Sequence, residues 1–171
     1  MHSAREAGYS FQILDAVTEV NERQKSHLVV KIKRYFGDIS SKKFALWGLA
    51  FKPNTDDIRE APALEIIDEL LNAGASVAAF DPEAMSNVKN IVGDKITFCE
   101  TPYDCLENAD ALIIATEWNE FRTPDFDKIL STLKEPVIFD GRNVFDVAAM
   151  EKKGFHYESI GRPLVNQPKL V

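Results

Sequence analysis

Residues 44–62 read FALWGLAFKPNTDDIREAP, and this stretch decides the fold class. It begins as an apolar run, breaks at Gly48, continues as a polar loop and ends at Pro62, directly before apolar residues spaced by three and four. A short apolar run bounded by Gly is typical of a buried strand, and the spacing is typical of an amphipathic helix. Pro62 suits the first helical position. The stretch therefore predicts a strand ending near Ala50, a long loop and a helix over residues 62–73.

The rest of the chain alternates in the same way between short apolar runs and helical patterns. The clearest run, residues 111–115, is continuous rather than alternating, as in a strand buried on both faces of a parallel sheet. Strands that alternate with helices predict an α/β fold with a doubly wound, mostly parallel, Rossmann-like sheet. The other expected strands are residues 75–80, 96–98, 136–139 and 157–160, and the other expected helices are residues 83–92 (or a loop there), 102–108, 124–133 and 146–153.

One long helix is expected ahead of the first strand. Residues 11–36 contain neither Gly nor Pro, which predicts about seven helical turns ended by Gly37. The helix carries a stripe with spacings of three and four that is apolar at both ends and polar in the middle: Leu14, Val17, Asn21, Gln24, Leu28, Ile32 and Tyr35. Two interpretations stay open, a helix packed on its own domain or a connector that forms an oligomer seam.

Composition and charge exclude several classes of protein. A chain of 171 residues can bury one sizeable core, and 45% hydrophobic with 27% charged residues is ordinary for a globular domain. The net charge of −7 is unfavourable for nucleic acid or anionic membrane, and no apolar run approaches the ~20 residues of a membrane span. Two cysteines make no disulfide framework, and no signal-peptide core is evident. We therefore expect a cytoplasmic protein with neither nucleic-acid nor membrane partners.

The polar part of the opening stretch contains the candidate ligand contacts. Ligands of open α/β sheets bind beyond the carboxyl ends of strands, where Lys52 and Arg59 would project as donors for an anion. Each also has a plainer interpretation, a solvated lysine in the first case and a pair with Glu60 in the second. Asp56 and Asp57 are expected to hold turns through their own backbone rather than to act as an acid–base pair.

Three stretches of the sequence resemble a known protein family. Residues 48–62, GLAFKPNTDDIREAP, closely resemble the opening motif of the C-terminal domain of UDP-glucose 6-dehydrogenases, a domain shared by the UDP-glucose/GDP-mannose dehydrogenase family. Residues 110–121, DALIIATEWNEF, are similar to the family's strand followed by Thr-Glu-Trp, and residues 140–143, DGRN, are similar to its Asp-Gly-Arg loop. The resemblance covers nearly the whole chain.

The resemblance implies roles for four residues. Lys52 would contact the nucleotide sugar, and Phe51 would help to wall the site. Arg142 would also contact this substrate, which the resemblance gives as UDP-glucose or a related nucleotide sugar. Arg59 would face an NAD cofactor that is held mainly by another domain of the full enzyme.

Two features of the family are absent from the sequence. No Gly-x-Gly-x-x-Gly follows the first expected strand, where Gly48 stands alone. Neither Cys99 nor Cys105 is followed by the Phe-Pro-Lys-Asp that resemblance would require of a catalytic cysteine, so both are expected to be small buried residues. Trp118 and Phe121 are likewise expected to pack. We therefore expect no catalytic residue and no metal site in this chain, and interpret it as the C-terminal domain of a larger enzyme, inactive alone.

This interpretation divides the chain in two. Residues 1–37 would be the end of a central connecting helix that forms a homodimer, because residues 4–9 and 20–25 resemble the end of the family's central segment. Residues 38–171 would be the UDP-binding domain, and the full enzyme would convert UDP-glucose to UDP-glucuronate with two NAD. The alternatives are the C-terminal domain of a UDP-N-acetylmannosamine or GDP-mannose dehydrogenase, and a non-enzymatic module that dimerises or binds nucleotide.

Overall fold

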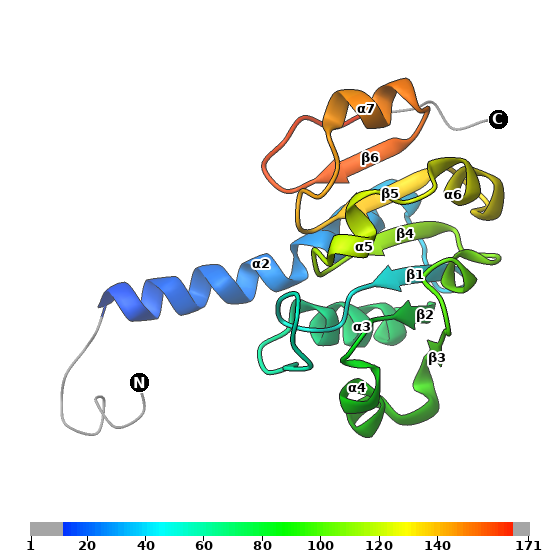
Figure 1. The fold of residues 1–171 in the computed structure, drawn as a ribbon. Coiled ribbons are helices and arrows are strands. Elements are labelled where there is room, and N and C mark those ends of the chain that lie inside the picture. The colour runs from blue at the N-terminus through cyan, green and yellow to red at the C-terminus, as the bar shows by residue number, and fades with distance from the viewer. Residues whose placement is uncertain (1–11, 166–171) are drawn as a thin grey trace.

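The computed structural model describes residues 12–165, except for seven side chains near its start. These side chains belong to Gln12, Leu14, Asp15, Thr18, Glu22, Arg23 and Lys25. Within the described range, six parallel strands form one sheet in the order β3-β2-β1-β4-β5-β6 (Figure 1). The strands are β1 (Lys43–Trp47), β2 (Ser76–Phe80), β3 (Thr97–Phe98), β4 (Ala111–Ile114), β5 (Val137–Asp140) and β6 (His156–Ser159). The expected doubly wound, Rossmann-like α/β fold is confirmed.

Helices connect the strands and precede them. The helices are α2 (Gln12–Phe36), α3 (Pro62–Asn72), α4 (Met85–Val92), α5 (Asn119–Arg122), α6 (Phe126–Thr132) and α7 (Val147–Lys152), with the short 3-10 turns η1 (Gly93–Lys95) and η2 (Asp104–Leu106). The chain builds the sheet outward from β1 to β3 and then returns to the centre to place β4 beside β1. The strand order therefore reverses between β1 and β4, and open α/β sheets bind their ligands at such a switch point.

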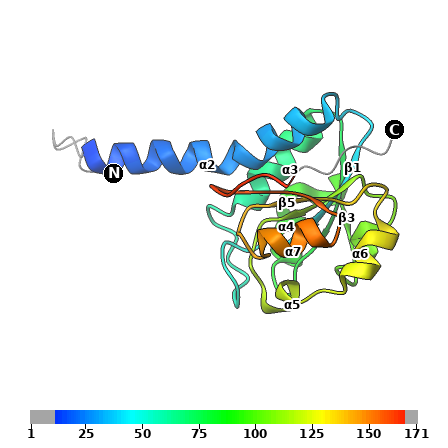
Figure 2. The same cartoon turned by 90° about the horizontal axis from the view of Figure 1, so that it is seen from above.

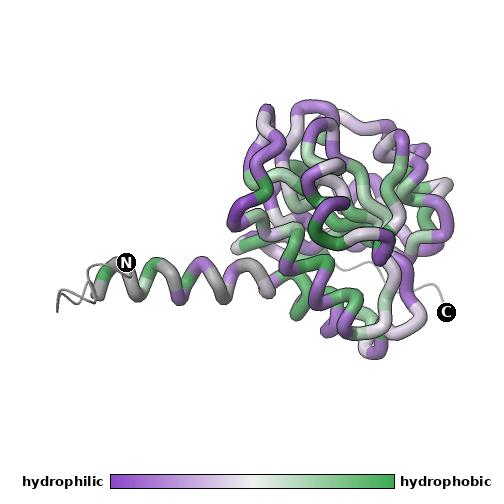
Figure 3. Tube along the Cα trace, turned by 90° about the horizontal axis from the view of Figure 1, so that it is seen from below, coloured by the Kyte–Doolittle hydropathy of each residue, from purple (hydrophilic) through white to green (hydrophobic). Residues whose placement is uncertain are grey.

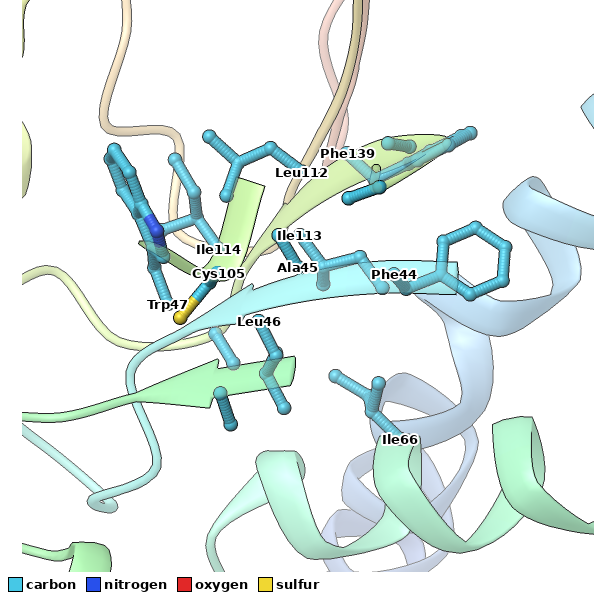
Figure 4. Close-up of a cluster of buried hydrophobic side chains, with 14 of the residues drawn as sticks. Phe44, Ala45, Leu46, Trp47, Ile66, Cys105, Leu112, Ile113, Ile114 and Phe139 are labelled. Atoms are coloured by element: carbon cyan, nitrogen blue, oxygen red, sulfur yellow. The ribbon is translucent and has the colours of Figure 1, made fainter. Parts of the chain in front are cut away.

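The helices cover both faces of the sheet (Figure 2). Successive residues of a strand point to opposite faces. On one face the ring of Phe44 lies 5.8 Å from Phe36 at the end of α2, and on the other Trp47 stacks on Phe121 of α5 at 5.1 Å. Figure 4 shows Ile66 of α3 projecting toward the strands. The side chains of the strands thus form much of the core. Figure 3 shows hydrophobic stretches of the trace inside the body of the molecule and hydrophilic stretches around its outside.

The long helix α2 has two halves with different surroundings. Its C-terminal half packs on the sheet and buries Leu28, Val29 and Ile32, which at about 1.5–3 kcal/mol per side chain is a substantial anchor. Its N-terminal half projects from the body of the molecule (Figures 1 and 2), and there Ile13 and Val17 are 80% and 49% exposed. The prediction of a single helix is confirmed for residues 12–36, and residue 11 lies outside the described part.

Ion pairs tie α2 to the edge of the sheet. The ammonium of Lys31 lies 2.8 Å from the carboxylate of Glu158 on β6, and Arg34 pairs with the same oxygen. Glu158 is buried, so losing both partners would leave an uncompensated charge. The C-terminal half of α2 is therefore both packed on the sheet and ion-paired to it.

Some predicted boundaries were wrong. The first strand ends at Trp47 rather than near Ala50, because Gly48 adopts φ +92° and turns the chain. The helix expected over residues 102–108 is only the 3-10 turn η2, because Thr101 and Asp104 bond to each other's backbone N–H, at 3.3 and 2.9 Å, and close a local turn. The four-residue helix α5 was not predicted.

Candidate functional site

A cavity of about 490 Å³ lies at the carboxyl edge of the sheet, next to the switch point. Ala115 and Gly141, which directly follow β4 and β5, form its floor. Phe51 contributes from the loop after β1, and Pro62 from the first turn of α3. Polar side chains from α2 and the loops also line it: Asn21, Gln24, Glu60 and Arg142. A cavity of this size can hold a small organic ligand.

The loop after β1 is fixed where it leaves the strand. A Cβ built on Gly48 would lie 2.5 Å from the Cβ of Thr116, so only glycine permits this approach. The hydroxyl of Thr116 donates to the carbonyl of Ala50 at 2.6 Å. Thr116, in the connection that follows β4, thus occupies the space beside Gly48. A pyrophosphate would need this space in order to approach the backbone.

A buried aspartate holds the same loop from the neighbouring strand. Asp81 follows β2, is fully buried, and its Oδ2 accepts hydrogen bonds from the backbone N–H of Leu49 at 2.6 Å and of Ala50 at 3.0 Å. The indole Nε1 of Trp118 donates to the same oxygen at 3.0 Å. Its Oδ1 accepts from the backbone N–H of Glu83 and Ala84. Trp118 therefore packs and bonds structurally, as predicted, and the packing role of Phe121 is confirmed by its burial.

Asp56 and Asp57 fold the tip of this loop. The side chain of Asp57 accepts from the backbone N–H of Arg59 at 3.0 Å, and the guanidinium of Arg59 closes a fork on it at 2.9 and 2.7 Å. The Arg59 hydrogen bonds lower the pKa of Asp57 to about 2. Asn87 of α4 donates to the backbone and side-chain oxygens of Asp56. The predicted turn-holding role is confirmed for Asp57, whereas the Asp56 side chain accepts from Asn87 of α4 and not from the backbone of its own loop. Arg59 forms an ion pair with Asp57.

Asp140 organises the loop after β5 that carries Arg142. This carboxylate is fully buried, and it accepts from the backbone N–H of Arg142 at 2.8 Å and of Val144 at 2.7 Å. The hydroxyl of Tyr157 also donates to Asp140 at 2.8 Å, and burial with this carboxylate nearby raises the pKa of Tyr157. The backbone of Arg142 is thus held by the core of the sheet.

The side chain of Arg142 is held as well. Its Nη2 lies 2.9 Å from one carboxylate oxygen of Glu117, and its Nε donates to the other. Glu117 stands in the connection that follows β4, so the fork joins two neighbouring loops. The hydrogen bonds lower the pKa of Glu117 and raise that of Arg142. One edge of the guanidinium is therefore occupied, whereas no residue of the described part of the chain bonds to its Nη1 donors, which can serve a ligand.

The structure brings together two of the four predicted site residues. Phe51 and Arg142 line the cavity, and the side chain of Phe51 is 47% exposed. Lys52 and Arg59 lie in the same loop after β1 and at the same edge of the sheet, but they do not line the cavity. Within residues 12–165 Lys52 has no ion pair, and it is exposed near enough to Asp57 to help lower the pKa of that carboxyl. The roles of all four residues stay predictions.

Sequence reasoning missed the residues that fix the site. Asp81 directly follows β2 and Asp140 is the last residue of β5, and an aspartate at the end of a buried strand was the available signal. Glu117 lay in the recognised Thr-Glu-Trp motif without a predicted role. Asn21 and Gln24 form the polar break in the helical stripe, and this break is a sequence signal that by itself names no ligand.

The described residues contain neither a metal centre nor an exposed cysteine. Among them no group of three His, Cys, Asp or Glu side chains could hold a metal ion. Cys99 and Cys105 are buried, as predicted, and Cys105 lies on the same side of the sheet as Trp47 (Figure 4). In the part of the chain that the structure describes, no helix is long and apolar enough to cross a membrane.

Comparison with known proteins gives the site its context. The profile of the UDP-glucose/GDP-mannose dehydrogenase family, UDP binding domain, matches residues 45–147. The chain is 43% identical over 162 residues to UDP-glucose 6-dehydrogenase TuaD of Bacillus subtilis (strain 168), which covers 95% of this chain and 35% of that protein. It is 44% identical over 169 residues to a UDP-glucose 6-dehydrogenase of Pseudomonas aeruginosa, and this match covers 95% of this chain and 37% of that protein. The chain thus spans about a third of the length of these curated relatives.

Solved structures agree with the sequence comparison. A UDP-glucose dehydrogenase from the archaeon Pyrobaculum islandicum matches 92% of this chain and 34% of its own at a TM-score of 0.78 and 32% identity. A UDP-D-ManNAc dehydrogenase from Pyrococcus horikoshii matches 93% of this chain and 36% of its own at a TM-score of 0.72 and 26% identity. The chain belongs to the UDP-glucose/GDP-mannose dehydrogenase family and carries its UDP binding domain.

Proposed function

We propose that this chain is the nucleotide-sugar-binding part of an NAD-dependent UDP-glucose 6-dehydrogenase, and that its cavity receives UDP-glucose. The observation that carries the proposal is the position of Arg142, held by Asp140 and Glu117 at the rim of a cavity at the switch point of the sheet. A planar guanidinium with free donors suits the oxygens of a diphosphate.

Each proposed contact has its own physical basis. Arg142 binds the diphosphate through its Nη1 donors, and Phe51 covers one side of the ligand with its half-exposed ring. Lys52 approaches the same ligand from the loop after β1, where it is exposed. Arg59 serves the cofactor side, because its side chain is 87% exposed beside Asp57 and is open to a contact from another domain.

NAD does not fit the first turn of this sheet. Thr116 fills the space beside Gly48, and the next residues carry side chains where the dinucleotide fingerprint has glycines. We therefore assign NAD mainly to a part of the full-length enzyme beyond this chain. The residues of this chain bind and orient the nucleotide sugar, and the oxidation to UDP-glucuronate takes place only in the full enzyme. Purified chain mixed with UDP-glucose and NAD should form no NADH, and NADH formation that Lys52→Ala abolishes would contradict this.

Ligand titration tests the binding role directly. Calorimetry of the purified chain should show binding of UDP-glucose in preference to UDP-N-acetylmannosamine and GDP-mannose, which stand for the rival members of the family. Arg142→Ala should weaken UDP-glucose binding about ten- to a hundredfold, which corresponds to about 1.5–3 kcal/mol for one charge-assisted hydrogen bond. Arg59→Ala is the matched control and should leave the affinity unchanged. The proposal fails if none of the three ligands binds, or if the two variants behave alike.

We also propose that the projecting half of α2 forms a homodimer seam, and that residues 1–37 belong to the central connecting segment and residues 38–171 to the UDP-binding domain. Ile13, Val17 and Val20 support this, because they are 80%, 49% and 46% exposed at spacings of four and three. Light scattering should give a dimer for the chain and a monomer for Val17→Glu. An identical mass for both would contradict the seam.

A further inference from the structure

One stripe of helix α2 changes character along its length. Asn21, Gln24, Leu28, Ile32 and Tyr35 follow spacings of three and four, so they share one face of the helix. Leu28 and Ile32 are buried, and the ring of Tyr35 packs on an aromatic ring of β5 at 6.2 Å. Asn21 and Gln24 continue this face beyond the packed region, and both line the cavity. The packing face of the helix thus becomes a polar wall where the cavity begins.

The position of this wall is fixed by a close approach between α2 and the loop after β5. A Cβ on Gly141 would lie 2.7 Å from Cδ1 of Leu28. Because glycine has no side chain, Leu28 of the helix can pack directly against the backbone of Gly141. Gly141 precedes Arg142, and both line the cavity together with Asn21 and Gln24. The contact between Leu28 and Gly141 therefore fixes where the amides of Asn21 and Gln24 lie relative to the guanidinium of Arg142.

The polar wall formed by Asn21 and Gln24 differs in chemistry from Arg142 on the neighbouring loop. The guanidinium of Arg142 is a cation suited to phosphate oxygens. The amide of an Asn or Gln carries two donors and one acceptor without a charge, which suits hydroxyl groups or the edge of a base. We propose that Asn21 and Gln24 bind the uncharged part of the nucleotide sugar, its hexose or its base, and help to decide which nucleotide sugar is accepted. A site built to hydrogen-bond a hydroxyl rejects ligands that lack it.

This inference rests on the proposed function, and three variants test it in the full chain. Asn21→Ala and Gln24→Ala each remove one amide, and Ser26→Ala is a matched control on the other side of the same helix. Alanine is the best helix former, so the thermal unfolding of all three should match the unchanged chain. Affinities are measured by calorimetry for UDP-glucose, UDP and UMP.

Each amide variant should weaken UDP-glucose about five- to tenfold, the value of one neutral hydrogen bond, while Ser26→Ala changes nothing. An equal loss for UDP and UMP assigns the amides to the nucleoside, and a loss confined to UDP-glucose assigns them to the hexose. Unchanged UDP-glucose affinity in both amide variants, with Arg142→Ala still weakened, overturns this inference and leaves the proposed function standing. No binding of any ligand by the unchanged chain overturns both.

Discussion

Two loops at the carboxyl edge of the sheet, residues 48–61 and 141–146, each carry an arginine and each depend on a buried aspartate. The arginines nevertheless differ. Arg59 is 87% exposed and pairs with Asp57, two residues earlier in the same loop. Arg142 is 35% exposed and pairs with Glu117, 25 residues away in a different connection. A pair between near neighbours needs only its own loop, whereas a pair between distant residues needs the completed fold.

This difference separates a preorganised donor from an exposed one. Binding an anion with a side chain that is already ordered avoids an entropy cost of about 0.5–1.5 kcal/mol at the moment of binding. Arg142 is held at its backbone by Asp140 and at its guanidinium by Glu117, so it meets this condition. Arg59 is ordered only by Asp57 on the surface, which suits a contact that is completed by another part of the full enzyme.

The largest expected effect concerns the buried aspartate beneath the first loop. Asp81→Asn replaces a carboxylate that accepts five hydrogen bonds with an amide that presents donors to some of the same N–H groups. We expect the free energy of unfolding to fall by about 3 kcal/mol, measured by urea denaturation. Asp56→Asn is the control, because Asp56 is exposed and accepts only from Asn87. A loss of less than about 1 kcal/mol for Asp81→Asn would show that the loop does not depend on it.

A smaller effect is expected for the partner of Arg142. Glu117→Gln should lower the stability at pH 7 by about 1 kcal/mol, because the pair is only partly shielded from solvent. The folded-state pKa of Glu117 is lowered, so its contribution is present above the unfolded pKa and is lost as the pH falls through the folded pKa. As the pH falls from about 5 to below the ordinary glutamate pKa of about 4.3, the unchanged chain should therefore lose more stability than the variant. Parallel pH dependences would mean that the pair contributes nothing.

The smallest effect is expected for the exposed arginine. Arg59→Ala should leave the free energy of unfolding unchanged within the error of the measurement, since exposed surface pairs contribute little. Chemical denaturation of Arg59→Ala and of Glu117→Gln under the same conditions compares how much each ion pair contributes to the free energy of unfolding. If Arg59→Ala were the more destabilising of the two, the distinction between a local and a tertiary pair would be wrong.

The order of elements was predictable because its signals are local. The apolar run at residues 111–115 and the helical spacing after Pro62 each identify an element without reference to the rest of the chain. The four residues of α5 are too few to show a period, and its ring contact between Phe121 and Trp47 is tertiary. The helix expected at residues 102–108 failed because side-chain bonds at Thr101 favoured a turn.

The candidate site was predictable only in part for a related reason. Phe51 and Arg142 were chosen from motifs, and the parallel topology explains why loops after different strands meet at one edge. The ion pair between Glu117 and Arg142 joins residues that no local pattern connects. The same holds for the Oδ2 atom of Asp81, whose three hydrogen-bond donors stand more than thirty residues from it in the loop after β1 and in the connection after β4.

The most direct test of the account follows the two arginines while the ligand binds. In nitrogen–proton NMR spectra of the full chain, the Nε–H signals of Arg142 and Arg59 are assigned from Arg142→Lys and Arg59→Lys variants. Addition of UDP-glucose should shift the Arg142 signal, because its guanidinium shares the cavity with the ligand, and leave the Arg59 signal in place. A shift of Arg59 with Arg142 unmoved, or no shift at saturating UDP-glucose, would contradict a nucleotide-sugar site built around Arg142.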